Sequence, residues 1–266
     1  MLLQRIATAL LLAPVVLAII IYGNDVVFSL FSGFLVLMIG YEWCQIVKAS
    51  KINSIVIAIA ISLIIVFINS ANFIVIDAGR IFIAASIIWL LCFLWLFKPQ
   101  SGNINYSVKY ALGVGILLLF GASLVSIHQV PEYGVKLTLV LFFLVWVADI
   151  GAYVTGKSIG KHKLAKKISP GKTIEGLLGG LVFTGIYGYF VAIWLQQEWL
   201  SFVIVFPIIA AISVVGDLFA SLLKRQANIK DSGFLLPGHG GFLDRFDSLI
   251  AAGPFYFAFI HYINIS

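Results

Sequence analysis

Long apolar runs, separated by short polar breaks, make up most of the chain. A helix crosses the hydrocarbon core of a bilayer with about 20 mostly apolar residues. Runs of this length occur at residues 5–22, 26–47, 53–72, 80–97, 107–127, 135–156, 174–195, 201–223 and 246–264. Because backbone polar groups in lipid must be satisfied within their own segment, each run is expected to form a helix. The pattern predicts an all-α, polytopic integral membrane protein with about nine transmembrane helices, the first of them uncleaved.

Composition and charge agree with this pattern and add an orientation. Of the 266 residues, 62% are hydrophobic and 11% are charged, whereas soluble domains carry about 25% charged residues. With nine spans, all of the 17 Lys and Arg residues except Arg80 and Lys136 fall on one side of the membrane. Because basic loops are retained in the cytoplasm, the N-terminus and the long polar loops 157–173 and 224–245 are predicted to be cytoplasmic.

Polar residues are unevenly distributed along this single transmembrane domain, residues 1–266. Residues 1–134 carry little recognisable motif, and we interpret them as helices that serve lipid contact, packing and oligomerisation. Residues 135–266 contain both long polar loops and most of the charged side chains. The C-terminal helices and their cytoplasmic loops are therefore predicted to carry the catalytic site.

The eighth run and the loop after it hold the densest group of charges. The spacing places four polar side chains on one helical face: Asp217, Ser221, Lys224 and Arg225. The segment continues with Lys230, Asp231, His239, Gly240, Gly241, Asp244, Arg245 and Asp247. Cations and bare glycine backbone suit phosphate groups, and carboxylates suit a divalent ion. Asp217 lies inside an apolar run, where an acid needs a partner or an ion; a structural role stays open for His239, and helix capping for Asp247.

A second polar group precedes this segment. Asp149 lies in the sixth apolar run, and the loop 157–173 that follows carries six lysines. Ser169 or Thr173 is predicted to cap the next helix, and Lys172 and Thr173 are placed to reach a substrate phosphate. Two simpler interpretations stay open: the lysines orient the loop and meet anionic lipid, and Asp149 makes a hydrogen bond between helices.

Residues 221–247 contain the longer motif Ser-x2-Lys-Arg-x4-Lys-Asp-x-Gly-x2-Leu-Pro-x-His-Gly-Gly-x2-Asp-Arg-x-Asp. This motif resembles the signature of the phosphatidate cytidylyltransferases, also called CDP-diacylglycerol synthases. Residues 149–153 and 169–176 are similar to two further segments of that family. The resemblance implies transfer of CMP from CTP to phosphatidic acid, which gives CDP-diacylglycerol and pyrophosphate in phospholipid biosynthesis. It also implies Mg²⁺ held by Asp217 and Asp244, and leaves open a second, monovalent cation.

The resemblance extends to partners, location and site residues. It implies CTP, phosphatidic acid and membrane lipids as partners, no nucleic acid, a homodimer, and a bacterial cytoplasmic (inner) membrane with the active site facing the cytoplasm. The expected catalytic residues are Asp217, Asp244, Lys224, Arg225, Lys230, Asp231, His239 and Arg245. The expected substrate-binding residues are Asp149, Ser169, Lys172, Thr173, Ser221, Gly240, Gly241 and Asp247.

The residue chemistry is consistent with this reaction. The second pKa of a phosphomonoester is about 6, so the lipid phosphate is already an anionic nucleophile and needs no general base. Positive charge from Mg²⁺, Lys224, Arg225, Lys230 and Arg245 would bring two polyanions together. Two other classes stay as alternatives: a CDP-alcohol phosphotransferase-type lipid enzyme, whose usual Asp-Gly-x2-Ala-Arg motif is absent from the chain, and a membrane transporter with an intramembrane ion site.

Overall fold

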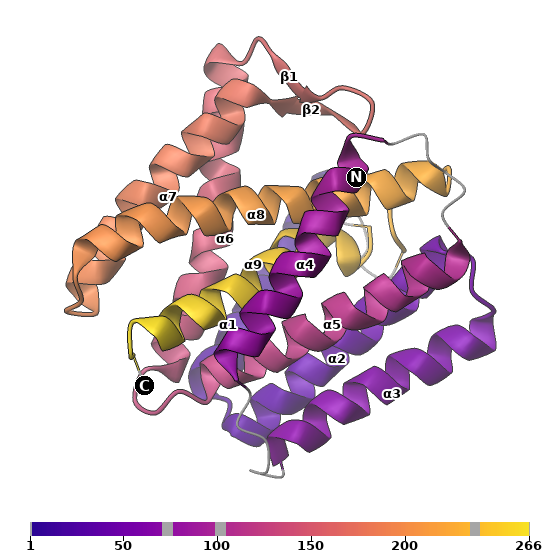
Figure 1. Cartoon of the computed structure of the whole chain (residues 1–266), viewed down its shortest axis with the longest axis horizontal. Helices are drawn as coiled ribbons and strands as arrows, with labels where there is room; N and C mark the ends of the chain where they lie inside the picture. The colour runs from indigo at the N-terminus through magenta and orange to yellow at the C-terminus, as the bar shows by residue number, and fades with distance from the viewer. Residues whose placement is uncertain (1, 71–76, 99–104, 235–239, 266) are drawn as a thin grey trace.

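A computed structural model describes residues 2–70, 77–98, 105–234 and 240–265 (Figure 1). These residues form helices along almost their whole length, with one short β-hairpin between the sixth and seventh helices. The elements are α1 (Leu2–Tyr22), α2 (Asp25–Ile46), α3 (Lys51–Ser70), α4 (Ala78–Leu96), α5 (Tyr106–His128), α6 (Gly134–Ile159), β1 (Lys163–Ala165), β2 (Ser169–Thr173), α7 (Ile174–Trp194), α8 (Trp199–Gln226) and α9 (Leu243–Tyr262). The predicted helical class is confirmed, and the hairpin is an addition to it.

Six helices in the described ranges are long and apolar enough to cross a membrane, judged by length and composition: α2, α4, α5, α6, α7 and α8. The described apolar stretches of α1 and α3 are shorter, at Leu12–Tyr22 and Ile52–Phe67. Helix α9 has Asp244 in its first turn and buries most of its later residues inside the protein. The structure supports a helical integral membrane protein, while the total of nine spans stays a prediction.

The helices pack as two groups that meet at α9. Helices α6, α7 and α8 are successive neighbours, and α2 packs against α3 and α5. In Figure 1, α6 and α7 lie side by side with the hairpin at one end, and α2, α3 and α5 run together in another part of the molecule. Helix α9 contacts α2, α4, α5, α6 and α8. The helix that carries the end of the signature motif therefore lies in the middle of the fold.

Helices α8 and α9 are in close contact along their length. Phe202 and Phe259 pack edge-on with ring centroids 5.1 Å apart, an arrangement that contributes about 0.5–1.5 kcal/mol beyond simple burial. Nearer the signature motif, Gly216 of α8 lies directly against the backbone of Asp247, where a Cβ atom would overlap the Asp247 carbonyl oxygen. This close approach brings the polar end of α8 beside the polar start of α9.

Short polar side chains begin several helices. Asn24 accepts a hydrogen bond from the Val27 N–H at 2.9 Å at the start of α2. At the start of α7, Thr173 Oγ1 accepts from the Gly176 N–H at 3.1 Å. Of the two caps predicted for this helix, Thr173 is therefore the one used, whereas Ser169 begins β2. Because Thr173 ends β2 and begins α7, the cap also fixes how the hairpin joins the helix.

The hairpin lies within the loop 157–173 and was not predicted from the sequence. Its antiparallel partners are Lys163 with Thr173 and Ala165 with Ser169. Strands of three and five residues are too short for an alternating pattern to be recognised. Glu175, in the first turn of α7, contacts the His162 side chain with 2.6 Å between Oε1 and Nδ1. The hairpin is thus fastened to the helix that follows it.

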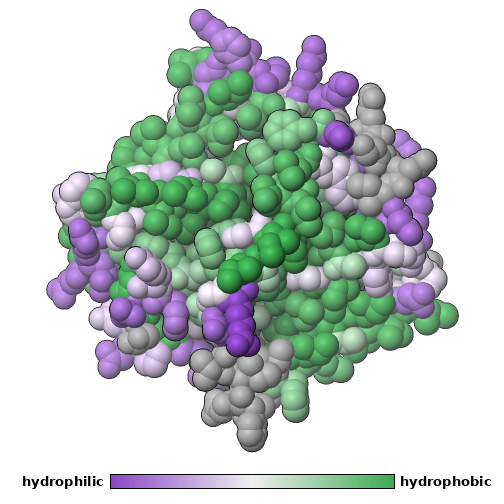
Figure 2. Space-filling view, in the orientation of Figure 1, coloured by the Kyte–Doolittle hydropathy of each residue, from purple (hydrophilic) through white to green (hydrophobic). Residues whose placement is uncertain are grey.

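Large apolar side chains cover much of the outer surface. Figure 2 shows a face that is mostly hydrophobic, with hydrophilic residues gathered toward its edges and over the β1–β2 hairpin at the top. On α4, the exposed residues include Ile83, Ile87, Leu90 and Leu94. Soluble proteins rarely expose continuous apolar surface of this extent. The outside of the molecule is therefore suited to contact with lipid.

Candidate active site

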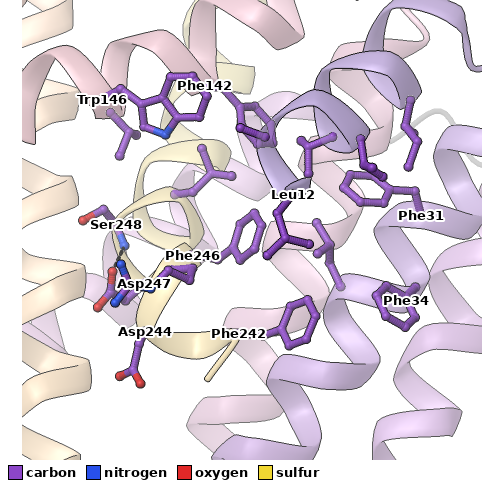
Figure 3. Close-up of a pocket in the computed structure, with 18 of the residues that line it drawn as sticks. Leu12, Phe31, Phe34, Phe142, Trp146, Phe242, Asp244, Phe246, Asp247 and Ser248 are labelled. Atoms are coloured by element: carbon purple, nitrogen blue, oxygen red, sulfur yellow. Dashed lines mark hydrogen bonds between the residues drawn. The ribbon is translucent and has the colours of Figure 1, made fainter. Parts of the chain in front are cut away.

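A cavity of about 980 Å³ lies between α1, α2, α6, α8 and α9. Helices α1, α2 and α6 supply a mostly apolar wall, and Figure 3 shows Leu12, Phe31 and Phe34 around a shared space, with Asp244, Asp247 and Ser248 together on another side of it. The charged lining residues are Asp149, Asp217, Lys224, Asp231, Asp244, Arg245 and Asp247. One pocket therefore offers hydrocarbon surface at one end and charged groups at the other.

Asp217 forms the first carboxylate centre at the polar end. It lies on α8, two turns before the end of the helix, and its Oδ1 accepts a hydrogen bond from Ser221 Oγ at 3.3 Å. Its Oδ2 forms an ion pair with Lys172 of β2. The predicted common face of Asp217 and Ser221 is confirmed by the first contact. The second joins two motifs that are distant in the sequence and compensates the charge of the acid.

Asp244 forms the second carboxylate centre, in the first turn of α9. Its Oδ1 pairs with Lys224 Nζ of α8 at 2.5 Å. Its Oδ2 accepts hydrogen bonds from the backbone N–H groups of Ser232 at 2.8 Å and Gly241 at 3.0 Å. Both side chains of the pair are nearly buried, with 9% of Lys224 and 7% of Asp244 exposed. This acid closes the turn between α8 and α9 as well as lining the pocket.

The two glycines before α9 make this closure possible. Gly240 has φ +80°, in the left-handed region, and a Cβ atom there would also collide with Asp244 Oδ2. Gly241 is buried, and a Cβ atom would overlap the side chains of Ser232 and Glu42. The sequence suggested that these glycines let backbone approach phosphate. The structure adds a second reason for glycine at these positions: a side chain at either one would collide with a carboxylate that lies against the turn.

Asp149 and Asp247 complete the acidic part of the lining. Asp149 reaches the pocket from α6. Asp247 reaches it from the second turn of α9, and its Oδ1 accepts a hydrogen bond from the Ser248 N–H at 2.8 Å. Because α9 begins at Leu243, Asp247 is too far inside the helix to be its N-cap. The capping interpretation of Asp247 is therefore wrong.

Other predicted residues are distributed around this centre. Arg225 turns toward the hairpin, where its Nε donates to the Ile168 carbonyl at 3.5 Å, whereas Arg245 lines the pocket. Lys230 is exposed, and Thr173 is buried with its hydroxyl used as the α7 cap. His239 lies outside the described residues. The structure thus gathers at one pocket the acids and the cations Lys224 and Arg245, and directs Arg225 elsewhere.

The carboxylates suit a hard divalent cation, and Mg²⁺ is usually held by one or two carboxylates together with substrate phosphates and waters. Among the described residues, no three Asp, Glu, His or Cys side chains are already arranged around a metal position. Asp244 has all its contacts supplied by protein donors, while Asp217 is 26% exposed. The residues therefore fit a Mg²⁺ site that substrate phosphates would complete, and of the two predicted ligands Asp217 is the more accessible.

One functional candidate was missed in the sequence. Glu42 lies on α2, only 2% exposed, and its carboxylate accepts hydrogen bonds from the signature segment. The available signal was an acid within the apolar run 26–47, the same signal that identified Asp149 and Asp217. Its partners lie about 190 residues or more further along the chain, so no local pattern connects them.

Comparisons with known proteins find similarity along nearly the whole chain. A model of the cytidylyltransferase family matches residues 3–263. A phosphatidate cytidylyltransferase of Haemophilus influenzae is 34% identical over 99% of this chain and 100% of its own length. One from Pseudomonas aeruginosa is 37% identical over 98% of this chain and 97% of its own length. The similarity thus covers the N-terminal helices as well as the signature segment.

Proposed function

The chain belongs to the cytidylyltransferase family, and we propose that it transfers CMP from CTP to phosphatidic acid, giving CDP-diacylglycerol and pyrophosphate. An oxygen of the lipid phosphate attacks the α-phosphorus of CTP, and the bond from that phosphorus to the bridging oxygen of the β-phosphate breaks. The observation that carries the proposal is a pocket that has both an apolar wall and a charged end. Such a pocket accommodates one substrate that comes from lipid and one that comes from water.

The apolar wall is suited to the acyl chains of the lipid. Residues of α1 and α2 such as Val16, Leu30 and Phe34 line it together with Phe142 of α6. Packed against this wall, the acyl chains stay out of water, and exposing them would cost roughly 25 cal/mol per Å². With the chains held there, the phosphate headgroup would lie toward Asp217 and Lys224. The N-terminal helices therefore bind substrate in this proposal; their wider assignment to packing and oligomerisation stays a prediction.

The polar end would neutralise and position the phosphates. Lys224 and Arg245 line it, and Lys172 is held beside it through its ion pair with Asp217. Fixed positive charge favours the negative charge that builds up on the leaving pyrophosphate. Mg²⁺, when bound through Asp217 and Asp244, would supply further positive charge to the triphosphate. The dianionic lipid phosphate is itself the nucleophile, so Asp149 and Asp247 are assigned no proton transfer.

We further propose nine spans, a cytoplasmic N-terminus and an active site that faces the cytoplasm of a bacterial inner membrane. The charge partition supports this orientation, because the basic hairpin and the loop 224–245 share one side. Lys167→Cys in the hairpin should react with an impermeant maleimide from the cytoplasmic side only. Labelling from the outside of intact cells would reverse the orientation. A homodimer stays a prediction of the family resemblance.

The test uses the purified full chain in detergent micelles with phosphatidic acid, CTP and Mg²⁺. We expect CDP-diacylglycerol and pyrophosphate in equal amounts, and loss of both when EDTA removes the divalent ion. The Asp217→Asn variant is the control for contaminating activity, because its partly exposed position should let it fold. A folded wild-type protein that forms no CDP-diacylglycerol under these conditions would contradict the proposal.

A further inference from the structure

Glu42 on α2 is buried and makes three hydrogen bonds to the signature segment. Its Oε2 accepts from Ser232 Oγ at 2.7 Å and from the Leu243 N–H at 2.9 Å. Its Oε1 accepts from the Phe242 N–H at 3.0 Å. Burying a carboxylate carries a large desolvation cost unless hydrogen bonds compensate for it. A buried acid with both oxygens engaged by one segment is therefore a specific attachment of that segment to α2.

The attachment satisfies a need at the start of α9. The first N–H groups of a helix have no partner within the helix, and a side chain at the N-cap usually accepts from them. The N-cap of α9 is Phe242, which provides no such hydrogen bond. Glu42 supplies the missing acceptor from another helix, and its negative charge is favoured at the positive end of the α9 dipole.

Glu42 and Asp244 together hold the two arms of the turn between α8 and α9. Ser232 donates one hydrogen bond from its hydroxyl to Glu42 and another from its N–H to Asp244. On the other arm, the Gly241 N–H donates a hydrogen bond to Asp244. Each arm also has a glycine, Gly233 or Gly241, where a Cβ atom would overlap the Glu42 carboxylate. The turn is thus closed at its base by two carboxylates, one from within the signature segment and one from α2.

We propose that Glu42 is a positioning residue of the active site, because it fixes the start of α9 and through it the Asp244–Lys224 pair at the polar end of the pocket. Glu42 is not one of the described residues that line the pocket, so it acts without touching substrate. The part of this inference that concerns catalysis rests on the proposed function. The part that concerns the turn stands on the hydrogen bonds alone.

The first test is Glu42→Gln, which keeps the size of the side chain but replaces one acceptor oxygen with an amide NH₂ group, itself a donor, among the donors of the segment. We expect kcat to fall about 10- to 100-fold, since small displacements of catalytic groups have effects of this size. KM for CTP should change little, because no contact to substrate is removed. The matched control is Glu198→Gln, the same change at an exposed position without a capping hydrogen bond. A kcat per folded enzyme within about twofold of wild type, whatever the thermal stability, would overturn the proposal.

The second test does not require activity. Cys44 and Cys92 are buried and free; in a background with both changed to Ala, a spin label is placed at Phe234→Cys, where the native side chain is 95% exposed. Glu42→Gln should raise the mobility of this label. A label at Tyr22→Cys, where the native side chain is 84% exposed and distant along the chain, should be unaffected. Unchanged mobility at position 234 would overturn the positioning role even if the wild-type enzyme were inactive in the CTP assay.

Ser232→Ala tests the positioning role of Glu42 if Glu42→Gln does not fold. This variant keeps Glu42 and its two backbone hydrogen bonds, and removes only the one from the hydroxyl. We expect a smaller fall in kcat, about threefold or more, because one hydrogen bond to a charged group is lost. The label at position 234 should again become more mobile. Wild-type kcat together with wild-type label mobility in Ser232→Ala would overturn the proposal.

Discussion

The polar end of the pocket contains two aspartate–lysine pairs that differ in their surroundings. Asp217 and Lys172 are each 26% exposed, and the lysine comes from the hairpin outside the helical core. Asp244 and Lys224 are 7% and 9% exposed, and two backbone N–H groups add to the pair. The first pair is open enough to exchange its lysine for a cation or a phosphate. The second has the satisfied contacts of a structural element.

This difference indicates separate roles for Asp217 and Asp244, to which the sequence analysis assigned the same role. Both acids were predicted to hold Mg²⁺, and that prediction is untested. Asp217 could take up a cation by releasing one partly exposed lysine. Asp244 would have to give up a buried lysine and keep the turn closed at the same time. We therefore expect substitutions at the open pair to affect mainly activity, and substitutions at the closed pair to affect stability as well.

The largest effect is expected from Asp217→Asn. The change removes the negative charge that would bind the cation, and the loss of one such electrostatic contact typically lowers kcat about 100- to 1,000-fold. The thermal midpoint should stay close to wild type because the site is partly exposed. Asp25→Asn, at an exposed acid at the start of α2, is the control. Activity within tenfold of wild type would remove Asp217 from the centre of the mechanism.

Removing the lysine of each pair should lower the free energy of unfolding by different amounts. Lys224→Ala leaves Asp244 buried without its cation, and breaking a buried pair in this way costs about 3 kcal/mol or more. Lys172→Ala exposes a carboxylate that water already reaches, and should cost less than about 1 kcal/mol. Thermal unfolding of both variants in one detergent measures the difference, with Lys167→Ala at an exposed position as the control. Equal losses for the two variants would show that the pairs do not differ as we argue.

Arg225 follows Lys224 in the sequence, and Arg245 follows Asp244. Replacing each arginine should lower the enzyme's activity to a different extent. Arg245, after Asp244, lines the pocket, whereas Arg225, after Lys224, donates to backbone carbonyls of Ile168 and Ile229. Removing a charged hydrogen-bond donor to substrate should lower kcat/KM for CTP about tenfold in Arg245→Ala. Arg225→Ala is its internal control and should change kcat/KM by less. A larger effect at Arg225 would place the substrate on the hairpin side.

Much of the framework could be predicted because it depends on local pattern. The apolar run 26–47 corresponds to Asp25–Ile46, and the run 135–156 to Gly134–Ile159. The hydrogen bond from Ser221 to Asp217 follows from helical spacing. The signature segment located the polar residues at the junction of α8 and α9. The helices and the Ser221 contact need only neighbours within a few turns of one helix, and the signature is one continuous stretch of sequence.

The contacts that organise the site could not be predicted, because each joins separate elements. Lys172 reaches Asp217 from a hairpin whose strands are too short to recognise. Glu42 reaches Ser232 across 190 positions of the chain. An acid within an apolar run signals that a partner exists, but the packing of α2 against the start of α9 decides which one. Tertiary structure therefore determines which charges are paired.

The smallest expected effect tests how the open pair is held. Thr173 caps α7 directly after Lys172, so Thr173→Ala should loosen the strand that presents this lysine to Asp217. Loss of an N-cap costs about 1 kcal/mol, and kcat should fall only slightly because Lys172 and Asp217 both remain. Ser169→Ala is the matched control, since Ser169 begins the same strand without capping the helix. Thermal unfolding should distinguish the two variants; an equal loss in both would mean that the hairpin, and not the cap, positions Lys172.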